Sequence, residues 1–293
     1  MPGTDESAAR KLAELRDKID AIDAEMHRLL IARGSVIDTL IKVKGTSRPG
    51  AAFRPGREAE MMRRLVARHE GALPLATVEH IWREIITTFT RMQAGFDVGV
   101  DLSVEPERMR DLARFTFGFS VKLLAFADPT AVVAHVARGN DLGLIARDQP
   151  KEAGAWWRGL TGATSPRIMA LLPFIKAAGG PADLPAFVVS PQLSDPSPAD
   201  LEIHAVRVSG RWREVAGGMR LAGAEEGDAT EVLLAVPGPS GEQAVAERAK
   251  AAGMLVESVQ AVGGAARGIA VDGTASMLYQ RLDLKGAADE PRA

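Results

Sequence analysis

The 293-residue sequence contains no cysteine, and this absence removes several chemistries at once. Disulfide bonds, thiolate metal sites and cysteine nucleophiles are all excluded. Long apolar runs are missing too, since no stretch reaches the ~18 consecutive apolar residues of a transmembrane helix. The first residues, MPGTDESAARK, lack the apolar core of a signal peptide. We therefore expect a cytoplasmic protein that does not associate with membranes.

The sequence also lacks an excess of charge of either sign, because its formal net charge is only −2. Nucleic acids and anionic membranes attract strongly basic surfaces, so neither is expected as a partner. Hydrophobic residues make up 46% of the chain and charged residues 25%, which is typical of a globular protein. At ~150 residues per domain, the length indicates about two domains.

Glycine is sparse in the first hundred residues, where the sequence predicts three helices. The first runs from about Glu6 to Lys44, since it has no internal proline and is followed by Gly45. A loop over 46–54 leads to a second helix over 55–70, and a third follows from Leu75 or Thr77 to Gly95. The first helix would be roughly 58 Å long at 1.5 Å per residue. That length suits a helix shared between protomers.

One cation interrupts an apolar stripe on the first helix. The stripe follows a 3,4 spacing and contains Leu12, Leu15, Ile19, Ile22, Met26, Leu29, Val36 and Leu40. Arg33 occupies the position between Leu29 and Val36 that would continue it. A guanidinium at such a position should be buried, and a buried cation needs an anionic partner. Since no neighbour in the stripe is acidic, we expect Arg33 to bind the carboxylate of a ligand. We expect this ligand to be a small dianion.

Arg16 and Lys44 lie on the same predicted helix and differ in their relation to Arg33. Lys44 is separated from Arg33 by about 20° around the helix and roughly 16.5 Å along it, so both side chains could reach one small molecule. Arg16 is about 25 Å from Arg33 and about 100° around the helix. One small ligand cannot touch both from the same chain. If Arg16 is functional, it serves the site of a partner protomer in an intertwined dimer.

After Asp101, glycine and proline become frequent and short β-rich runs appear. These runs are 121–126, 142–145, 186–189, 203–208 and 232–236, and helical patterns occur at 129–138, 153–160 and 242–252. The order strand, helix, strand over 121–145 predicts a parallel crossover unit. The fold class is therefore multidomain, with an N-terminal all-α three-helix domain followed by an α/β (α+β) C-terminal region.

Five segments in order carry a family resemblance. They are Leu15–Asp23, Leu29–Arg33, Lys42–Lys44, Phe53–Ala59, and Ile81–Ile86 with Gln93. Through them, residues 9–96 resemble the all-helical (type II) chorismate mutases, both free-standing and fused to prephenate dehydratase. The resemblance implies a homodimer that converts chorismate to prephenate by an intramolecular Claisen rearrangement, without a cofactor or metal. Catalysis would then depend on holding the reactive conformer and stabilising charge on the breaking ether oxygen.

The same resemblance assigns roles to residues on the first helix. It implies that Arg33, together with Arg16 of the partner subunit, clamps the two carboxylates of chorismate. It implies that Lys44 donates a hydrogen bond to the ether oxygen. These assignments agree with the spacing argument, in which Arg33 and Lys44 share a ligand and Arg16 completes the site of the other chain.

The second and third helices supply the remaining roles that the resemblance implies. Gln93 would donate to the ether oxygen, Glu58 would accept from the ring hydroxyl, and Arg57 would support the cluster. A glutamine is a better donor here than a glutamate, because a carboxylate must first be protonated to assist an oxyanion. Two positions depart from the family pattern: Phe89 narrows the pocket, and Arg54 stands where some members carry aspartate.

The C-terminal region resembles two other modules loosely. Residues 105–210 are similar to part of a prephenate dehydratase domain, through Asp128–Gly139 and Asp141–Ile145. The Thr-Arg-Phe motif of that family appears only as Pro185-Ala186-Phe187, so we expect no dehydratase activity.

Residues 230–273 are similar to an ACT regulatory module, a small amino-acid-sensing fold. We therefore expect a mutase domain at 5–98, a dehydratase-like remnant at 105–210 and an ACT-like unit at 228–285, with an aromatic amino acid as the candidate effector. The alternative is that the whole C-terminal half is structural or stabilises a dimer.

Two other functions stay open at this point. An isochorismate-pyruvate lyase would use the same cationic pocket, and a non-enzymatic dimeric ligand-binding protein would carry a lost mutase site. His135, His204 and the Trp156-Trp157 pair are interpreted as structural groups, with one tryptophan ring in the core and one at its boundary. No metal cluster is predicted.

Overall fold

The computed structural model describes residues 3–44, 52–139, 141–176, 182–193 and 199–271. The chain divides into two compact units, residues 1–47 and residues 48–293. Most of the predicted loop 46–54 and the end of the predicted range 228–285 lie outside the described residues. Within the described residues, no helix is both long and apolar enough to span a membrane.

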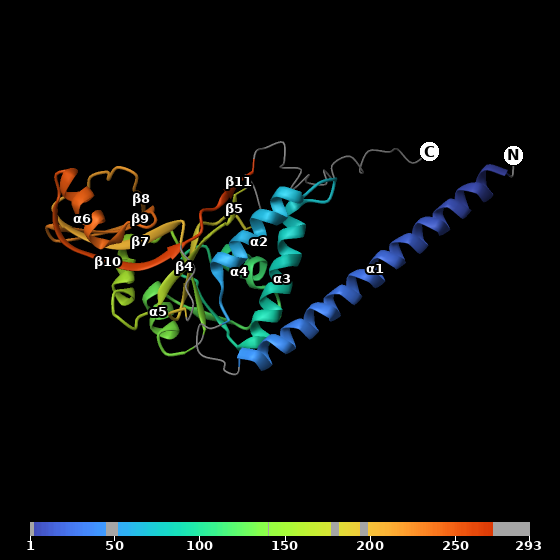
Figure 1. Cartoon of the computed structure of the whole chain (residues 1–293). Coiled ribbons are helices and arrows are strands. Elements are labelled where there is room, and N and C mark those ends of the chain that lie inside the picture. The colour runs from blue at the N-terminus through green and yellow to red at the C-terminus, as the bar shows by residue number, and fades with distance from the viewer. Residues whose placement is uncertain (1–2, 45–51, 140, 177–181, 194–198, 272–293) are drawn as a thin grey trace, which may run out of the picture. The chain divides into compact units, whose positions relative to one another are not determined.

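The first unit consists of one helix, α1 (Gly3–Lys44), which confirms the predicted long N-terminal helix (Figure 1). Its apolar stripe is largely exposed in the single chain, from 47% at Leu15 to 67% at Val36. An exposed apolar face of this length marks an interaction surface, because isolated helices gain little stability from propensity alone.

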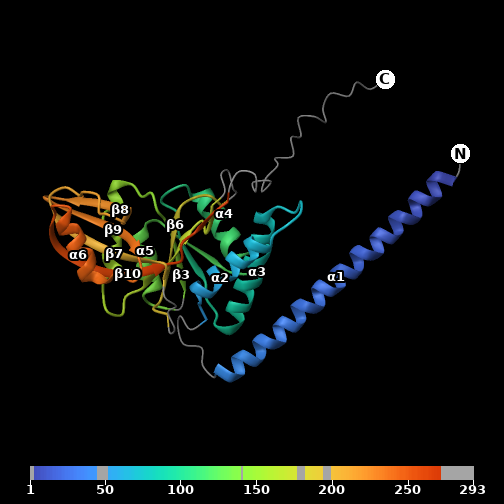
Figure 2. The ribbon, with the colours of Figure 1, turned by 45° about the horizontal axis from the view of Figure 1, so that its top comes forward.

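Helices α2 (Pro55–Arg68) and α3 (Leu75–Gln93) begin the second unit and confirm the other two predicted helices. Pro55 occupies the first turn of α2, where a missing N–H costs nothing. Gly71, at φ +88°, allows the turn between the helices. The two helices lie side by side in Figures 1 and 2, and Met62, Leu65 and Leu75 are buried in their common core.

A nine-stranded mixed sheet forms the centre of the second unit. Its strands are β1 (Val98–Asp101), β2 (Leu123–Phe126), β3 (Leu142–Ala146), β4 (Arg167–Leu172), β6 (Ala186–Ser190), β7 (Leu201–Ser209), β8 (Met219–Glu226), β9 (Ala229–Pro237) and β10 (Leu255–Ala265). They are arranged in the order β2-β1-β3-β6-β4-β10-β7-β9-β8, and β5 (Ile175–Lys176) pairs separately with β11 (Ile269–Ala270). The helices of this region are α4 (Pro106–Phe117), α5 (Pro129–Val136) and α6 (Gly241–Ala251), with short 3₁₀ helices η1 (Lys151–Ala153) and η2 (Trp156–Leu160).

The predicted parallel crossover over 121–145 is confirmed. Strands β2 and β3 both pair in parallel with β1, and α5 connects them. No strand was predicted at β1, which contains Gly99 and begins only a few residues after the third helix. Asp128 caps α5 by accepting a hydrogen bond from the backbone N–H of Ala131 at 2.8 Å.

Both faces of the sheet are covered, which explains its nearly continuous apolar strands. On one face, α5 and η2 pack on residues that include Ile168, Ile203 and Leu233. On the other face, α4 packs on β1 and β3, and α6 packs on β7 and β9. The side chains of β9 alternate between the two faces of the sheet: Leu234 faces α6, and Leu233 faces the core beneath α5 and η2.

Two expectations for residues 153–160 are wrong. The predicted helix is replaced by η1 and η2, because Gly154 adopts φ +55° and interrupts helical geometry between them. Both tryptophan rings are buried, Trp156 at 3% and Trp157 at 2% exposed, so neither lies at a boundary. The rings contact each other edge to face with centroids 5.8 Å apart.

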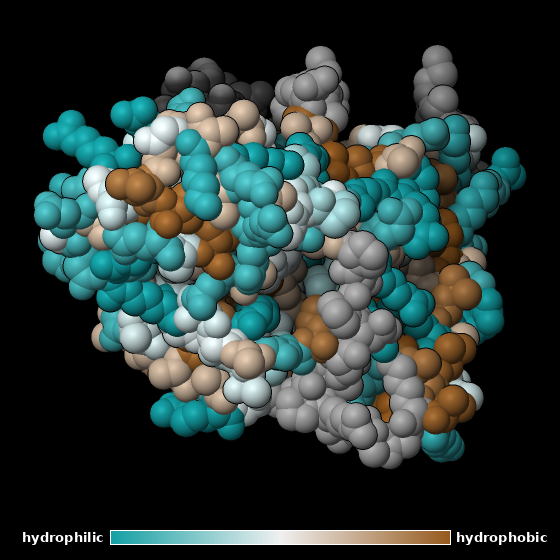
Figure 3. All heavy atoms as spheres, turned by 60° about the vertical axis from the view of Figure 1, so that its left-hand side comes forward, coloured by the Kyte–Doolittle hydropathy of each residue, from teal (hydrophilic) through white to brown (hydrophobic). Residues whose placement is uncertain are grey.

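The last strands form a split β-α-β arrangement. Strands β9 and β10 are both antiparallel to β7, which lies between them, and α6 connects them. Strand β10 also pairs with β4, so the sheet is continuous through the ranges 105–210 and 228–271. The three domain boundaries therefore stay predictions. In Figure 3 the surface of this region is mainly hydrophilic, and its hydrophobic patches are small, as is normal for a globular protein.

Candidate functional site

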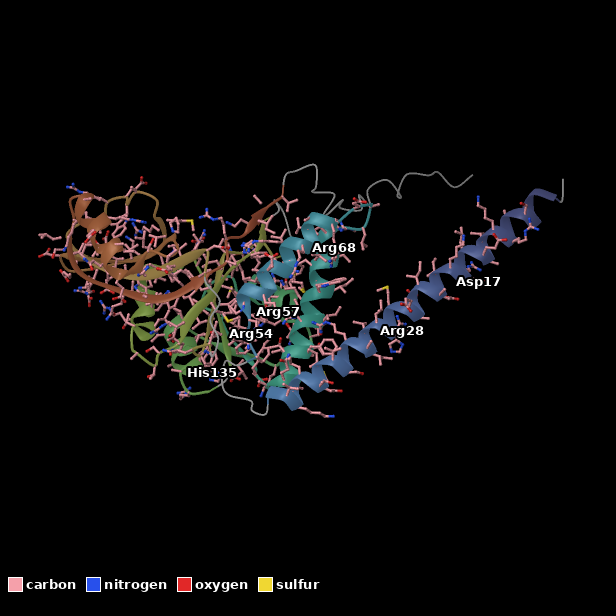
Figure 4. The ribbon with its side chains drawn as sticks, in the orientation of Figure 1. Asp17, Arg28, Arg54, Arg57, Arg68 and His135 are labelled. Atoms are coloured by element: carbon pink, nitrogen blue, oxygen red, sulfur yellow. The ribbon has the colours of Figure 1, made fainter. Side chains whose placement is uncertain are left out.

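Helix α1 carries three of the predicted site residues. Arg16 is exposed, Arg33 is half-buried, and the side chain of Lys44 at the end of the helix lies outside the described residues. Another arginine on α1, labelled in Figure 4, has a local partner: Arg28 donates to Glu25 over 2.6 and 2.7 Å. Such an exposed i,i+3 pair contributes little to stability. Arg28 is thus a suitable control position for Arg33.

The first turn of α2 presents two predicted site residues in different environments. Arg57 is exposed and is labelled in Figure 4 near the start of the helix. Glu58 is half-buried, and its backbone N–H donates to the carbonyl of Arg54 at 3.0 Å. Consecutive residues on a helix are about 100° apart, so one of the pair faces solvent when the other faces the protein.

Glu58 lies near a buried ion pair that was not predicted from the sequence. On α3, Arg83 donates from Nε and Nη2 to the same oxygen of Glu79, at 3.1 and 3.0 Å. Burial raises the pKa of Glu58, and the positive charge of Arg83 opposes this shift. In the sequence, the i,i+4 spacing of Glu79 and Arg83 is the pattern from which this ion pair could have been predicted.

Glu58 and Arg83 together line two small cavities in this unit. These measure about 30 and 40 Å³, and the first is also lined by the hydroxyl side chains of Thr87, Thr90 and Thr116. A space of this size holds about one water molecule, whose share of liquid volume is about 30 Å³. Neither cavity can hold a dicarboxylate with a six-membered ring.

Phe89 and Gln93 lie one turn apart near the end of α3, and both are half-buried. The side-chain amide of Gln93 donates to the carbonyl of Phe89 at 3.0 Å. An amide has two N–H donors, so this bond leaves one for a ligand. Neither residue lines the cavities beside Glu58. The structure thus places Glu58 with Arg83, and Gln93 with Phe89, on different stripes of the helical hairpin.

The environment of Glu58 predicts a pH-dependent stability. A carboxyl whose pKa is raised in the folded state holds its proton more tightly than in the unfolded chain. Raising the pH through the window above the ordinary value of 4.5 therefore disfavours the folded state. We expect Glu58→Gln to melt at a higher temperature than the wild type at pH 7 to 8, with the gap closing at acidic pH.

Thermal unfolding of both proteins across this pH range measures the effect. Glu60→Gln is the matched control, because Glu60 is an exposed glutamate in the same helix, and we expect it to leave the pH dependence unchanged. A wild type that gains stability over Glu58→Gln as the pH rises would contradict the prediction.

The two histidines of the α/β region have different environments. His135, labelled in Figure 4, is satisfied as expected, with Nε2 2.7 Å from Asp141 Oδ2. His204 is fully buried at 0% exposed, and neither ring nitrogen has a hydrogen-bond partner among the described residues. Nε2 of His204 lies 3.4 Å from Oε2 of Glu202, so the interpretation of His204 as a structural group stays a prediction. No cluster of three or more potential metal ligands occurs in the described part of the chain.

The helical region is similar to known proteins. Residues 15–94 match the family described as chorismate mutase type II. A bifunctional chorismate mutase/prephenate dehydratase of Neisseria gonorrhoeae (strain ATCC 700825 / FA 1090) is 39% identical over 72 residues, which are 25% of this chain and 19% of that relative. This chain thus spans about a fifth of the length of the relative that it matches. No solved structure matches the chain.

Proposed function

We propose that this chain, which carries a chorismate mutase type II domain at residues 15–94, converts chorismate to prephenate. The observation that carries the proposal is the family match over α1, α2 and α3, which contain every predicted site residue. The mixed α/β region after these helices fits a dehydratase-like part, as in the bifunctional relative. The prediction of a type II chorismate mutase domain, followed by a region that mixes helices and strands, is confirmed.

The chemistry of the reaction agrees with the side chains available. A Claisen rearrangement breaks one C–O bond and forms one C–C bond within a single molecule, so it needs no acid, base or nucleophile. Arg33 and Lys44 supply positive charge for the carboxylates and the ether oxygen, and Gln93 retains an amide donor. Preorganised donors of this kind stabilise developing negative charge because they need not reorient during the reaction.

We also propose an intertwined homodimer in which Arg16 completes the site of the other chain. The exposed apolar stripe of α1 supports this, since its side chains from Leu12 to Val36 stay about half exposed in a single chain. A second copy of the same helix would bury them and bring each Arg16 toward the other chain. The small cavities beside Glu58 agree with a substrate site that needs more than α2 and α3.

The C-terminal region is proposed to be regulatory, without dehydratase chemistry, and an aromatic amino acid is the proposed effector. Ala186 and Phe187 stand where that family has its Arg and Phe, and both are buried in β6 at 2% and 0% exposed. Pro185 supplies no hydroxyl, and Ala186 supplies no guanidinium. A cytoplasmic location stays a prediction.

A steady-state assay with product identification tests the function. We expect purified protein to consume chorismate and accumulate prephenate in equal amount, with no dehydrated product. Salicylate and pyruvate formed from isochorismate, with chorismate left unchanged, would instead indicate an isochorismate-pyruvate lyase. Loss of neither substrate would favour a non-enzymatic dimer with a lost mutase site.

A further inference from the structure

Helix α3 buries a stripe of polar side chains. Glu79, Arg83, Thr87 and Thr90 recur at i,i+4 or i,i+3 spacing, so they share one face of the helix, and each is 6–9% exposed. The apolar residue Met92 of the same helix is 52% exposed by contrast. Burying polar groups costs free energy unless they have partners. The stripe therefore needs polar partners on the elements packed against it.

Arg83 is the charged centre of this stripe. Its Nε and Nη2 donate to one oxygen of Glu79, at 3.1 and 3.0 Å, and the two side chains are only 11% and 7% exposed. These bonds use two of the five N–H donors of the guanidinium. In the described part of the chain, Arg83 forms its ion pair with Glu79 and with no other carboxylate. The pair holds the guanidinium in place and leaves it with donors for a further acceptor.

Glu58 of α2 is the acid that shares a space with Arg83. Both line the two cavities of about 30 and 40 Å³ beside the helical hairpin. Among the described residues that line these cavities, Glu58 and Arg83 are the only charged ones. Much of the remaining lining is apolar, and includes Phe53, Phe117 and Met169. Opposite charges attract more strongly where water is scarce, so the charge of Arg83 acts on Glu58 with little screening.

The other charged groups around Glu58 stand outside the two cavities. Arg57, the preceding residue, is exposed, and Glu79, which pairs with Arg83, lines neither cavity. Helix α4 and strands β3 and β4 contribute only uncharged side chains to the lining. Two carboxylates therefore depend on one guanidinium. Burial raises the pKa of Glu58, the positive charge of Arg83 opposes this shift, and the charge of Glu79 cancels part of that opposition.

The charge on Glu58 matters because its assigned role is to accept a hydrogen bond from the ring hydroxyl of chorismate. An ionised carboxylate is purely an acceptor, and a bond to it is stronger than a bond to a neutral group. A protonated carboxyl lacks this charge and also presents a donor. The cavities beside Glu58 each hold about one water molecule, so each also accommodates one hydroxyl group.

We propose that Arg83 is a positioning residue of the mutase: held by Glu79, its guanidinium keeps Glu58 a carboxylate that accepts the ring hydroxyl. In this role Arg83 touches no substrate and acts through Glu58. Its part in the reaction rests on the proposed function, whereas its effect on Glu58 does not. Removing Arg83 and removing the charge of Glu79 should therefore move the ionisation of Glu58 in opposite directions.

The pH dependence of kcat/KM for chorismate, measured on the full chain, tests this role. Activity should rise with pH as Glu58 loses its proton. Arg83→Gln should move this rise to higher pH and lower kcat/KM about tenfold on the acidic limb, because a nearby guanidinium favours the ionised carboxyl by about that factor. The two profiles should converge at alkaline pH. Glu79→Gln should move the rise to lower pH, because the charge of Arg83 then acts on Glu58 alone.

Opposite shifts separate this role from a structural one, since a variant that only loosens the packing loses activity at every pH. Arg83→Lys keeps the positive charge and should restore most of the wild-type profile. Arg64→Gln is the matched control: Arg64 is exposed on α2 and pairs with Glu60 at 3.7 Å, so its profile should stay that of the wild type. Parallel losses at every pH in Arg83→Gln and Glu79→Gln would overturn the proposal. Should Arg83→Gln not fold, the direction of the shift in Glu79→Gln decides.

Carbon-13 NMR of the side-chain carboxyl group of Glu58 reads its ionisation without any substrate. Glutamate labelled at this carbon is incorporated into the full chain, and Glu58→Gln identifies the signal by its loss. We expect the titration midpoint to move up in Arg83→Gln and down in Glu79→Gln. A midpoint that stays in place in both variants overturns the proposal, even in an active enzyme. A wild type that consumes no chorismate, with both shifts present, refutes the proposed function while supporting the effect of Arg83 on Glu58.

Discussion

Arg33→Ala is expected to reduce kcat/KM for chorismate by at least about 100-fold, since losing one member of a buried charge pair costs on the order of 3 kcal/mol. Arg33 is the cation that interrupts the apolar stripe of α1, and the proposed mechanism uses it to hold one substrate carboxylate. Removing the guanidinium leaves that carboxylate without its donor. It also loosens the compact conformer in which the two reacting carbons meet. Steady-state kinetics over a range of chorismate concentrations measures the loss.

Arg28→Ala is the matched control for this experiment. Arg28 is on the same helix and loses the same group, but its partner is the exposed Glu25, one turn earlier in the helix. We expect its kcat/KM to stay within about twofold of the wild type, because exposed pairs contribute little. Circular dichroism verifies that both variants keep their helices. A fully active Arg33→Ala protein, with Arg28→Ala equally active, would remove the basis of the proposed function.

Mixing two inactive variants is expected to restore activity if Arg16 serves the partner subunit. Arg16→Ala and Arg33→Ala should each be nearly inactive alone, since every site in either homodimer lacks one carboxylate donor. In a mixed dimer, one site receives Arg33 from the first chain and Arg16 from the second, while the other site lacks both. Random exchange makes about half of the dimers mixed, each with one intact site of two, so about a quarter of the wild-type activity should return.

The mixing experiment separates a shared site from one built within a single chain. Subunits are exchanged by unfolding and refolding the two variants together, and chorismate consumption is measured against each variant treated alone. Arg28→Ala mixed with Arg33→Ala is the control, because Arg28 is not assigned to any site and half of the wild-type activity is expected there. No gain of activity for the Arg16 and Arg33 pair, in dimers verified by native mass spectrometry, would contradict the shared site.

Local patterns predicted the helical region well for physical reasons. Proline at the start of α2, glycine after it and an unbroken 3,4 spacing in α1 each act within a few residues, so helix bounds follow from nearby sequence. Strand β9 was found because burial on both faces makes its centre, residues 232–236, continuously apolar. No strand was predicted at β1, which contains Gly99, and η2 was predicted as an α-helix because helical spacing does not reveal the positive φ of Gly154.

The sequence alone indicated that Arg33 needs an anionic partner, since an arginine in an apolar stripe is expected to be buried wherever the stripe packs. It could not indicate which groups meet across the fold. The position of Glu58 near the buried Arg83 depends on the packing of α2 against α3.

The grouping of Arg167, Glu202 and His204 around one cavity of the α/β region depends on strand order, because β10 enters the sheet between β4 and β7 although it is last of the three in sequence. Periodicity reports which face of an element is buried, and it carries no information about which neighbour buries it. Only the tertiary structure brings a cation and an acid more than thirty residues apart to the lining of one cavity.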